Sequence, residues 1–289
     1  MKNLIQLGFA TLLSVTFMTA KAQSKDTENS TLWEVSGNGL TQPSYIAGTF
    51  HIMCSQDFEI KPKVLKALEK SNHFVMEINY TDPTEMAAMQ KMYQTDKKLS
   101  DQLTPEEAKE LDKVLADYGT DLKKMDNSSS QALYALISMK ALPCPQTEIK
   151  LYEIELLQNA LKNKKKVSGL EKVEDQMTSI NKAYDLKAVI GQLKMGKEYE
   201  ILLKKMITAF KKEDLQSVYT LFKNDKIMNA GQEKAMLTDR NKNWVEKMPE
   251  MMKKESAFFA VGGAHLMGEN GVIHLLRSKG YTVKPVSSL

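Results

Sequence analysis

The sequence predicts an α+β protein in which strands from both ends of the chain form one central mixed β-sheet, covered by a large helical block. Two observations carry this prediction. Strand-like apolar runs gather in residues 32–79 and 258–285, whereas the middle of the chain repeats its apolar residues mostly with the 3.6-residue period of helices. The segments 83–142 and 185–254 are then helical layers or inserts around the sheet.

The first 22 residues have the pattern of a signal peptide. Lys2 gives a positive start, residues 4–18 are mostly apolar, and Ala-Lys-Ala ending at Ala22 is a cleavage site of the A-x-A type. We expect export to the periplasm or the medium after cleavage near Ala22, a disordered polar leader over 23–30, and a single domain over 31–289. No later stretch reaches the roughly 18 apolar residues of a membrane span, so none is expected in the mature chain.

The charge balance argues against one class of partner. The chain has 40 Lys and Arg against 36 Asp and Glu, a formal net charge of +4. This balance gives no electrostatic reason to expect nucleic acid or an anionic membrane as partner. We expect a peptide or small-molecule substrate, and the composition leaves the oligomeric state open.

The N-terminal elements are predicted from turn residues and alternation. Residues 32–36 and 44–48 flank a glycine-containing turn over 37–43 and form a β-hairpin. A short helix is expected over 61–71. A strand is expected over 73–79, where alternate residues are apolar.

The helical block is bounded by capping signals. Asp82-Pro83 and Thr104-Pro105 each place an N-cap residue before a proline, and a Pro-Cys-Pro break at 143–145 ends the first part. Further helices are expected over 151–163, 187–212, 215–240 and 241–254, with a short strand at 167–171. The C-terminal elements are a strand over 258–261, a helix over 271–279 that ends at Gly280, and a strand over 281–285.

Two histidines follow strand-like runs in the same G-x-x-H pattern, GTFH ending at His51 and GGAH ending at His265. A glycine at the exit of a buried strand allows a sharp turn and leaves room for a ligand. If the two strands are neighbours, the imidazoles converge. Glu77, the only acid in its apolar run, then completes a three-ligand set for a divalent metal such as Mn, Co or Zn, or acts as a catalytic base. The alternative is two hydrogen-bonded structural histidines.

Two further charged residues are candidates for the same site. Glu171 is a general base or an additional ligand, or else an ordinary acid at a helix N-terminus. Arg240 stabilises an anion in the site, or else forms a structural ion pair. His73 and His274 are interpreted as structural.

Cys54 and Cys144 are the only cysteines. In an oxidising compartment an even pair is most simply a disulfide. The alternative is that Cys54, three residues after His51, completes an H-x-x-C metal site.

These features together resemble the TraB/GumN family, which is related to the animal Tiki metalloproteases. The resemblance implies a metal-dependent hydrolase-like fold, shared more distantly with erythromycin esterase and the haem-binding ChaN proteins. It also implies that His51, His265 and Glu77 are the essential residues and that the cysteines pair. It is carried by residues 32–40, 48–51, 74–77, 169–171, 240–244, 258–266 and 280–283.

The leading functional hypothesis is an exported, divalent-metal-dependent hydrolase, peptidase-like in its substrate. His51, His265 and Glu77 hold the metal and its water, and Glu171 and Arg240 act behind them or face the substrate. The second hypothesis is a non-catalytic envelope protein that sequesters a peptide or haem in the same pocket. The third is a structural envelope protein whose histidines bond within the core.

Overall fold

The computed structural model describes residues 29–288, and the predicted signal peptide lies outside them. The α+β prediction is confirmed: a mixed sheet has the order β6-β4-β7-β2-β1-β8. Ser30, which the sequence prediction placed in the leader, is buried and donates a hydrogen bond to the carbonyl of Val286, so the folded domain includes it. The strands of this sheet are β1 (Leu32–Ser36), β2 (Ser44–Thr49), β4 (His73–Met76), β6 (Lys166–Gly169), β7 (Ala257–Gly262) and β8 (Thr282–Pro285).

The sheet has an antiparallel side and a parallel side. The predicted hairpin β1–β2 is antiparallel, and β8 adds to β1 in the same way. On the other side, β2, β7, β4 and β6 are all parallel, with Thr49 opposite Gly262 and Met76 opposite both Ala260 and Gly169. Four carboxyl ends therefore meet at one edge of the sheet.

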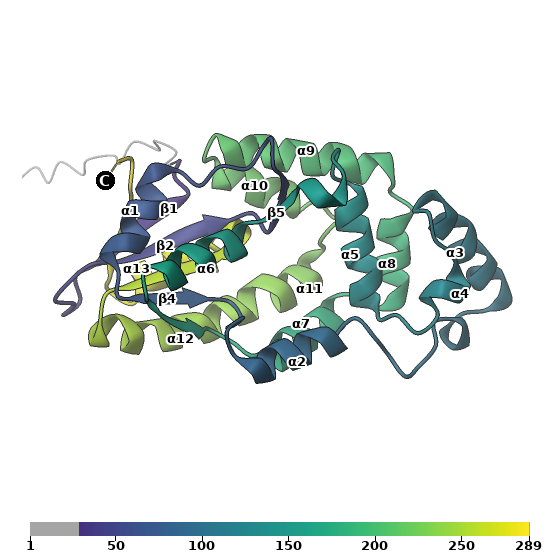
Figure 1. Ribbon diagram of the computed structural model, residues 1–289, viewed down its shortest axis with the longest axis horizontal. Coiled ribbons are helices and arrows are strands. Elements are labelled where there is room, and N and C mark those ends of the chain that lie inside the picture. Colours follow the sequence, from purple (N-terminus) through teal and green to yellow (C-terminus); the bar gives the residue numbers. More distant parts are fainter. Residues whose placement is uncertain (1–28, 289) are drawn as a thin grey trace, which may run out of the picture.

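Helices surround the sheet and extend beyond it (Figure 1). α1 and α6 contact β2, β4 and β6, whereas α13 contacts β8 and α12. α3, α4, α5 and α8 lie at the end of the molecule away from the sheet. The helices are α1 (Pro62–Lys70), α2 (Pro83–Lys91), α3 (Pro105–Asp117), α4 (Leu122–Met125), α5 (Ser130–Lys140), α6 (Tyr152–Lys162), α7 (Val173–Ala183), α8 (Leu186–Leu193), α9 (Lys197–Lys211), α10 (Leu215–Phe222), α11 (Ala230–Glu233), α12 (Asp239–Lys254) and α13 (Val272–Ser278).

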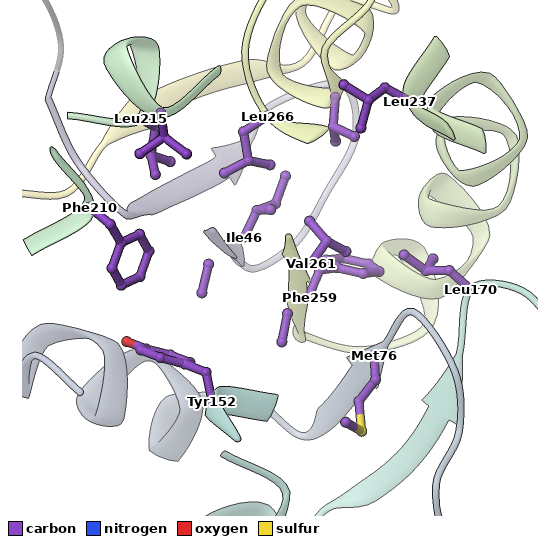
Figure 2. Close-up of a cluster of buried hydrophobic side chains, with 14 of the residues drawn as sticks. Ile46, Met76, Tyr152, Leu170, Phe210, Leu215, Leu237, Phe259, Val261 and Leu266 are labelled. Carbon is purple, nitrogen blue, oxygen red and sulfur yellow. The ribbon is translucent and has the colours of Figure 1, made fainter. Parts of the chain in front are cut away.

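The main core lies against the central strands. Every residue of β2 and β7 is buried. Figure 2 shows strand residues such as Ile46 and Phe259 gathered with Tyr152 of α6, Phe210 of α9 and Leu215 of α10. This packing fixes the ends of β2 and β7 relative to the helices that approach the same edge. Within residues 29–288, no helix is long and apolar enough to span a membrane.

Several local features differ from the sequence prediction. The strand expected over 73–79 ends at Met76, so Glu77 is the first residue beyond β4. α7 was not predicted, and neither was the small antiparallel sheet of β3 (Ile52–Cys54) and β5 (Ile149–Leu151). A π-helical turn, η3 (Lys234–Thr238), precedes α12. The remaining short turns are the 3₁₀ segments η1 (Ser100–Gln102), η2 (Gln146–Glu148) and η4 (Gly263–His265).

The predicted disulfide between Cys54 and Cys144 is present. It ties the end of β3 to the loop after α5, and Cys54 is fully buried. Because the thiol is consumed in the bridge, the alternative of Cys54 as a thiolate metal ligand is excluded in this structure.

Replacing both cysteines by alanine is expected to lower the free energy of unfolding by about 4–5 kcal/mol. The bridge joins residues 90 positions apart, and the chain-entropy model assigns roughly that cost to so long a loop. Urea denaturation of the variant and of the oxidised wild type measures the difference, with reduced wild type as the control. Coincident unfolding curves would contradict the expectation.

Candidate active site

Four predicted site residues lie at the carboxyl edge of the parallel strands. His51 lies two residues beyond β2, Glu77 directly follows β4, Glu171 lies two residues beyond β6, and His265 ends the η4 turn after β7. Because these strands are neighbours in the order β6-β4-β7-β2, residues far apart in sequence meet there. The carboxyl edge of a parallel sheet is the usual place for a ligand.

The glycines of the two G-x-x-H motifs have different roles, and neither needs a positive φ. A Cβ on Gly48 would lie 2.7 Å from Leu215 Cδ1 in the core. A Cβ on Gly262 would instead lie 3.3 Å from His51 Nε2 and 3.4 Å from Glu77 Oε1. Gly48 therefore permits close packing, whereas Gly262 keeps open the space between the imidazole and the carboxylate, which lie within about 7 Å of each other.

His51 lies at the solvent edge and is held by a buried carboxylate. Its side chain is 62% exposed, and its Nδ1 lies 2.7 Å from Oε1 of Glu153 at the start of α6. The Thr49 hydroxyl donates to the same oxygen. The negative charge of Glu153 raises the pKa of His51 to about 9, against the lowering by desolvation. Since Nδ1 carries the proton toward Glu153, Nε2 is directed at the space beside Gly262.

Glu77 is a buried carboxylate with a partner on each oxygen. Its Oε1 accepts a hydrogen bond of 2.8 Å from the backbone N–H of Gly262, and its Oε2 accepts one of 2.6 Å from Nη2 of Arg240. Burial raises the pKa of Glu77, but nearby positive charge, Arg240 foremost, outweighs it and brings the pKa to about 2. Glu77 is therefore ionised at neutral pH.

Arg240 uses all five of its N–H donors. Its Nε and Nη2 donate to the carboxylate of Glu171, with Nη2 at 2.6 Å, and its second Nη2 proton goes to Glu77. Its Nη1 donates to the carbonyl of Met236 at 3.0 Å and to Nε2 of His265 at 3.1 Å. The guanidinium thus joins two carboxylates and an imidazole.

Both ring nitrogens of His265 are engaged. Its Nδ1 lies 2.6 Å from Oδ1 of Asn241, and Asn241 is held in turn because its Nδ2 donates to the carbonyls of His265 and Asn270. With Nε2 accepting from Arg240, the ring is the neutral Nδ1–H tautomer. Burial, followed by the positive charge of Arg240, lowers the pKa of His265 to about 3.

One face of α12 supplies the interior wall of the site. Arg240, Asn241 and Trp244 are all buried on this helix. Trp244 Nε1 donates to Glu171, and its ring lies 4.4 Å from the ring of His265 and 4.9 Å from the guanidinium. π-Helical turns often occur at functional sites, and η3 leads directly into this face.

The structure brings together His265, Arg240, Glu77 and Glu171 in one hydrogen-bonded cluster, with His51 across the space beside Gly262. Sequence reasoning did not assign Glu153, Thr49, Asn241 or Trp244 to the site. Asn241 and Trp244 do stand in the 240–244 motif, but Glu153 resembles any acid in the first turn of a helix. His73 lies at the amino end of β4, where its Nε2 is 2.7 Å from the hydroxyl of Ser168, and His274 is an exposed residue of α13.

The residue types at this edge suit a divalent metal, although the Arg240 guanidinium is bonded to two of the side chains that a metal would need. Two imidazoles have their Nδ1 held by Glu153 and Asn241, the arrangement that orients metal-binding histidines. The site has three carboxylates, two bonded to the Arg240 guanidinium and the third, that of Glu153, bonded to His51, so a cation there would meet negative charge. Among residues 29–288, however, no group of three or more His, Cys, Asp or Glu side chains has the geometry to hold a metal ion. The donors fit a metal, and Arg240 is bonded to two of them.

The fold and this edge define an α+β domain with a buried polar cluster at the carboxyl ends of its parallel strands. Residues 31–285 match the model of the TraB/PrgY/gumN family, and the chain belongs to that family. The resemblance predicted from the sequence is thereby confirmed.

The curated relatives are more distant. The chain is 22% identical to Metalloprotease TIKI1 of Danio rerio over 89% of its own length and 63% of the relative's. It is also 22% identical to Metalloprotease TIKI2 of Xenopus tropicalis, over 91% of its own length and 61% of the relative's. The identity to the Metalloprotease TIKI homolog of Nematostella vectensis is again 22%, over 89% of this chain and 67% of the relative. The chain thus spans less than two thirds of the first two relatives. No solved structure gives a significant match.

Glu153→Gln is expected to lower the pKa of His51 from about 9 toward its ordinary value of 6.5. A raised folded-state pKa contributes stability that is fully present below about pH 6.5 and is lost as the pH rises through about 9, and the variant lacks this contribution. NMR titration of chelator-treated protein measures the His51 midpoint, with His73 as the internal control. A His51 midpoint unchanged by the substitution would contradict the assignment.

Proposed function

We propose that this protein is an exported, divalent-metal-dependent hydrolase that cleaves peptide bonds. The observation that carries the proposal is the meeting of His51, Glu77 and His265 at one sheet edge, in a family whose curated relatives are named metalloproteases. These three side chains would hold the metal. A divalent cation there would polarise a substrate carbonyl and make a water molecule more acidic.

In this proposal, the role of each site residue follows from how exposed its side chain is. His51 is the exposed member, so a metal held by its Nε2 would face an incoming substrate. Glu77 is ionised and faces the same space through Oε1, where it acts as a metal ligand or accepts a proton from the attacking water. Glu153 positions His51 from behind.

Arg240 and Glu171 act behind Glu77 in this proposal rather than toward the substrate. Both side chains are only 6% exposed, and Arg240 has no donor left for a substrate anion. Arg240 holds the Glu77 carboxylate in place, and Glu171 with Trp244 holds Arg240.

Export is supported by two features. Disulfides persist in oxidising compartments, and the chain has one between Cys54 and Cys144. The A-x-A pattern ending at Ala22 supports cleavage of a signal peptide there.

The test is the metal content of purified mature protein after reconstitution with Mn²⁺, Co²⁺ or Zn²⁺ and dialysis. We expect near-stoichiometric metal in the wild type and its loss in His51→Ala and Glu77→Gln. His274→Ala, which changes an exposed histidine of α13, is the matched control and keeps its metal. Absence of metal from the wild type with all three ions would contradict the proposal.

Activity is measured on a mixed peptide library with the same variants. The proposal predicts metal-dependent cleavage that His51→Ala abolishes. Saturable peptide binding with every peptide recovered intact would instead support the sequestering function, and a Soret band on haem titration would identify haem as its ligand.

Two neighbouring glycines allow the site to be separated from the fold. Gly262→Ala puts a methyl group between His51 and Glu77 and is expected to weaken Zn²⁺ binding about tenfold or more while the protein stays folded. Gly263→Ala puts its methyl 2.9 Å from Leu215 Cδ2 and is expected to cost about 1–3 kcal/mol of stability. Calorimetric titration and thermal unfolding measure both. Equal Zn²⁺ affinity in Gly262→Ala and wild type would contradict the assigned space.

A further inference from the structure

Arg240 is bonded to two of the atoms that a metal would need. Its Nη1 donates to Nε2 of His265 and its Nη2 to Oε2 of Glu77. His265 cannot offer Nδ1 instead, because that nitrogen is bonded to Asn241. With Arg240 in this position, His265 therefore has no free lone pair for a metal.

The other side of the site is open. Nε2 of His51 and Oε1 of Glu77 both border the space beside Gly262. The backbone N–H of Gly262 is the one hydrogen-bond partner that the structure gives to Oε1 of Glu77, and a carboxylate oxygen has capacity for a second. Two donors thus border open space with the arginine in place, and Nε2 of His51 becomes a ligand when the metal displaces its proton. The third donor, Nε2 of His265, becomes accessible only when the guanidinium moves.

Arg240 has a second set of contacts that does not involve the metal donors. Glu171 accepts hydrogen bonds from Nε and Nη2, and the carbonyl of Met236 accepts one from Nη1. The guanidinium also lies over the Trp244 ring. A guanidinium that released His265 and Glu77 would keep these partners. It would therefore remain paired within the fold instead of becoming a buried unpaired charge.

We propose that Arg240 is a built-in competitor of the metal: it occupies the place of a cation between Glu77 and His265, and metal binding displaces it onto Glu171. This inference rests on the proposed metal-dependent function. A second positive charge entering beside the guanidinium would be repelled at short range, and the two cannot share the His265 lone pair. Arg240 thereby keeps the metal-free site ordered and weakens its affinity for metal.

The choice of residue at this position supports the inference. The chain has only two arginines, Arg240 and Arg277, among its 40 basic residues. The planar guanidinium bridges two carboxylates and an imidazole, which a lysine ammonium with three donors cannot do in the same plane. Arg277 also lies over a tryptophan ring, that of Trp33, but it donates to the carbonyl of Val283, outside the candidate site.

Arg240→Met tests the competition, because it removes the charge and the donors and keeps an unbranched apolar stem on Trp244. We expect the Zn²⁺ affinity measured by calorimetric titration to rise about tenfold or more. The substitution frees Nε2 of His265 and Oε2 of Glu77 and removes the repulsion between the guanidinium and the metal. Arg277→Met is the matched control and leaves the affinity unchanged. An Arg240→Met affinity equal to or weaker than that of wild type would overturn the inference.

A second measurement leaves Arg240 intact, in case its loss prevents folding. The chain has two tryptophans, so in a Trp33→Phe background all tryptophan fluorescence comes from Trp244. Zn²⁺ does not itself quench tryptophan fluorescence. We expect the Trp244 fluorescence to change over the Zn²⁺ concentrations at which binding occurs, because the Arg240 guanidinium shifts its position over the Trp244 ring. Stoichiometric binding with unchanged Trp244 fluorescence would overturn the inference.

The outcomes separate the inference from the function on which it rests. If wild type binds Zn²⁺ through His51 and Arg240→Met binds no more tightly, the competitor role fails and the proposed function stands. If neither protein binds Zn²⁺, Mn²⁺ or Co²⁺, both fail.

Discussion

The buried guanidinium of Arg240 is the interaction on which the rest of the site depends. It joins α12 to the ends of β4 and β6 through Glu77 and Glu171, and to the turn after β7 through His265. A buried ion pair of this kind adds little net stability compared with an apolar core, but removing one partner leaves a charge without compensation, at a cost of about 3–5 kcal/mol. The cluster is therefore held as a unit, and each member sets the position of the others.

The sheet explains why these residues can meet. Four parallel strands end at one edge, and the loops that follow them carry His51, Glu77, Glu171 and His265. The antiparallel strands β1 and β8 complete the sheet on its far side and contribute none of these residues. Gly262 leaves space at this edge, where a methyl group would stand between His51 and Glu77.

Local sequence signals were enough to predict much of this arrangement. The turn glycines predicted the β1–β2 hairpin, and the repeated G-x-x-H pattern pointed to His51 and His265. Glu77 was singled out because an acid in an apolar run is costly to bury. The alternation of apolar residues continues to Asn79 and predicts a strand that includes Glu77, whereas β4 ends at Met76.

The remaining features depend on contacts between distant residues. Glu153 has the sequence context of an ordinary first-turn acid, and only the fold places it 2.7 Å from His51. The bond between Arg240 and His265 likewise has no local signature. It arises because the start of α12, which follows the π-helical turn η3, lies against the turn after β7. The sequence thus pointed to Arg240 as a candidate for the site, but not to its bonds with Glu77 and His265.

The competition between Arg240 and a metal is best tested by anomalous X-ray diffraction from crystals grown with Zn²⁺, recorded on both sides of the zinc absorption edge. We expect a zinc peak bounded by His51, Glu77 and His265, with Arg240 paired to Glu171 and no longer bonded to His265. A structure with no zinc at this edge, in which Arg240 still donates to both His265 and Glu77, would contradict this expectation.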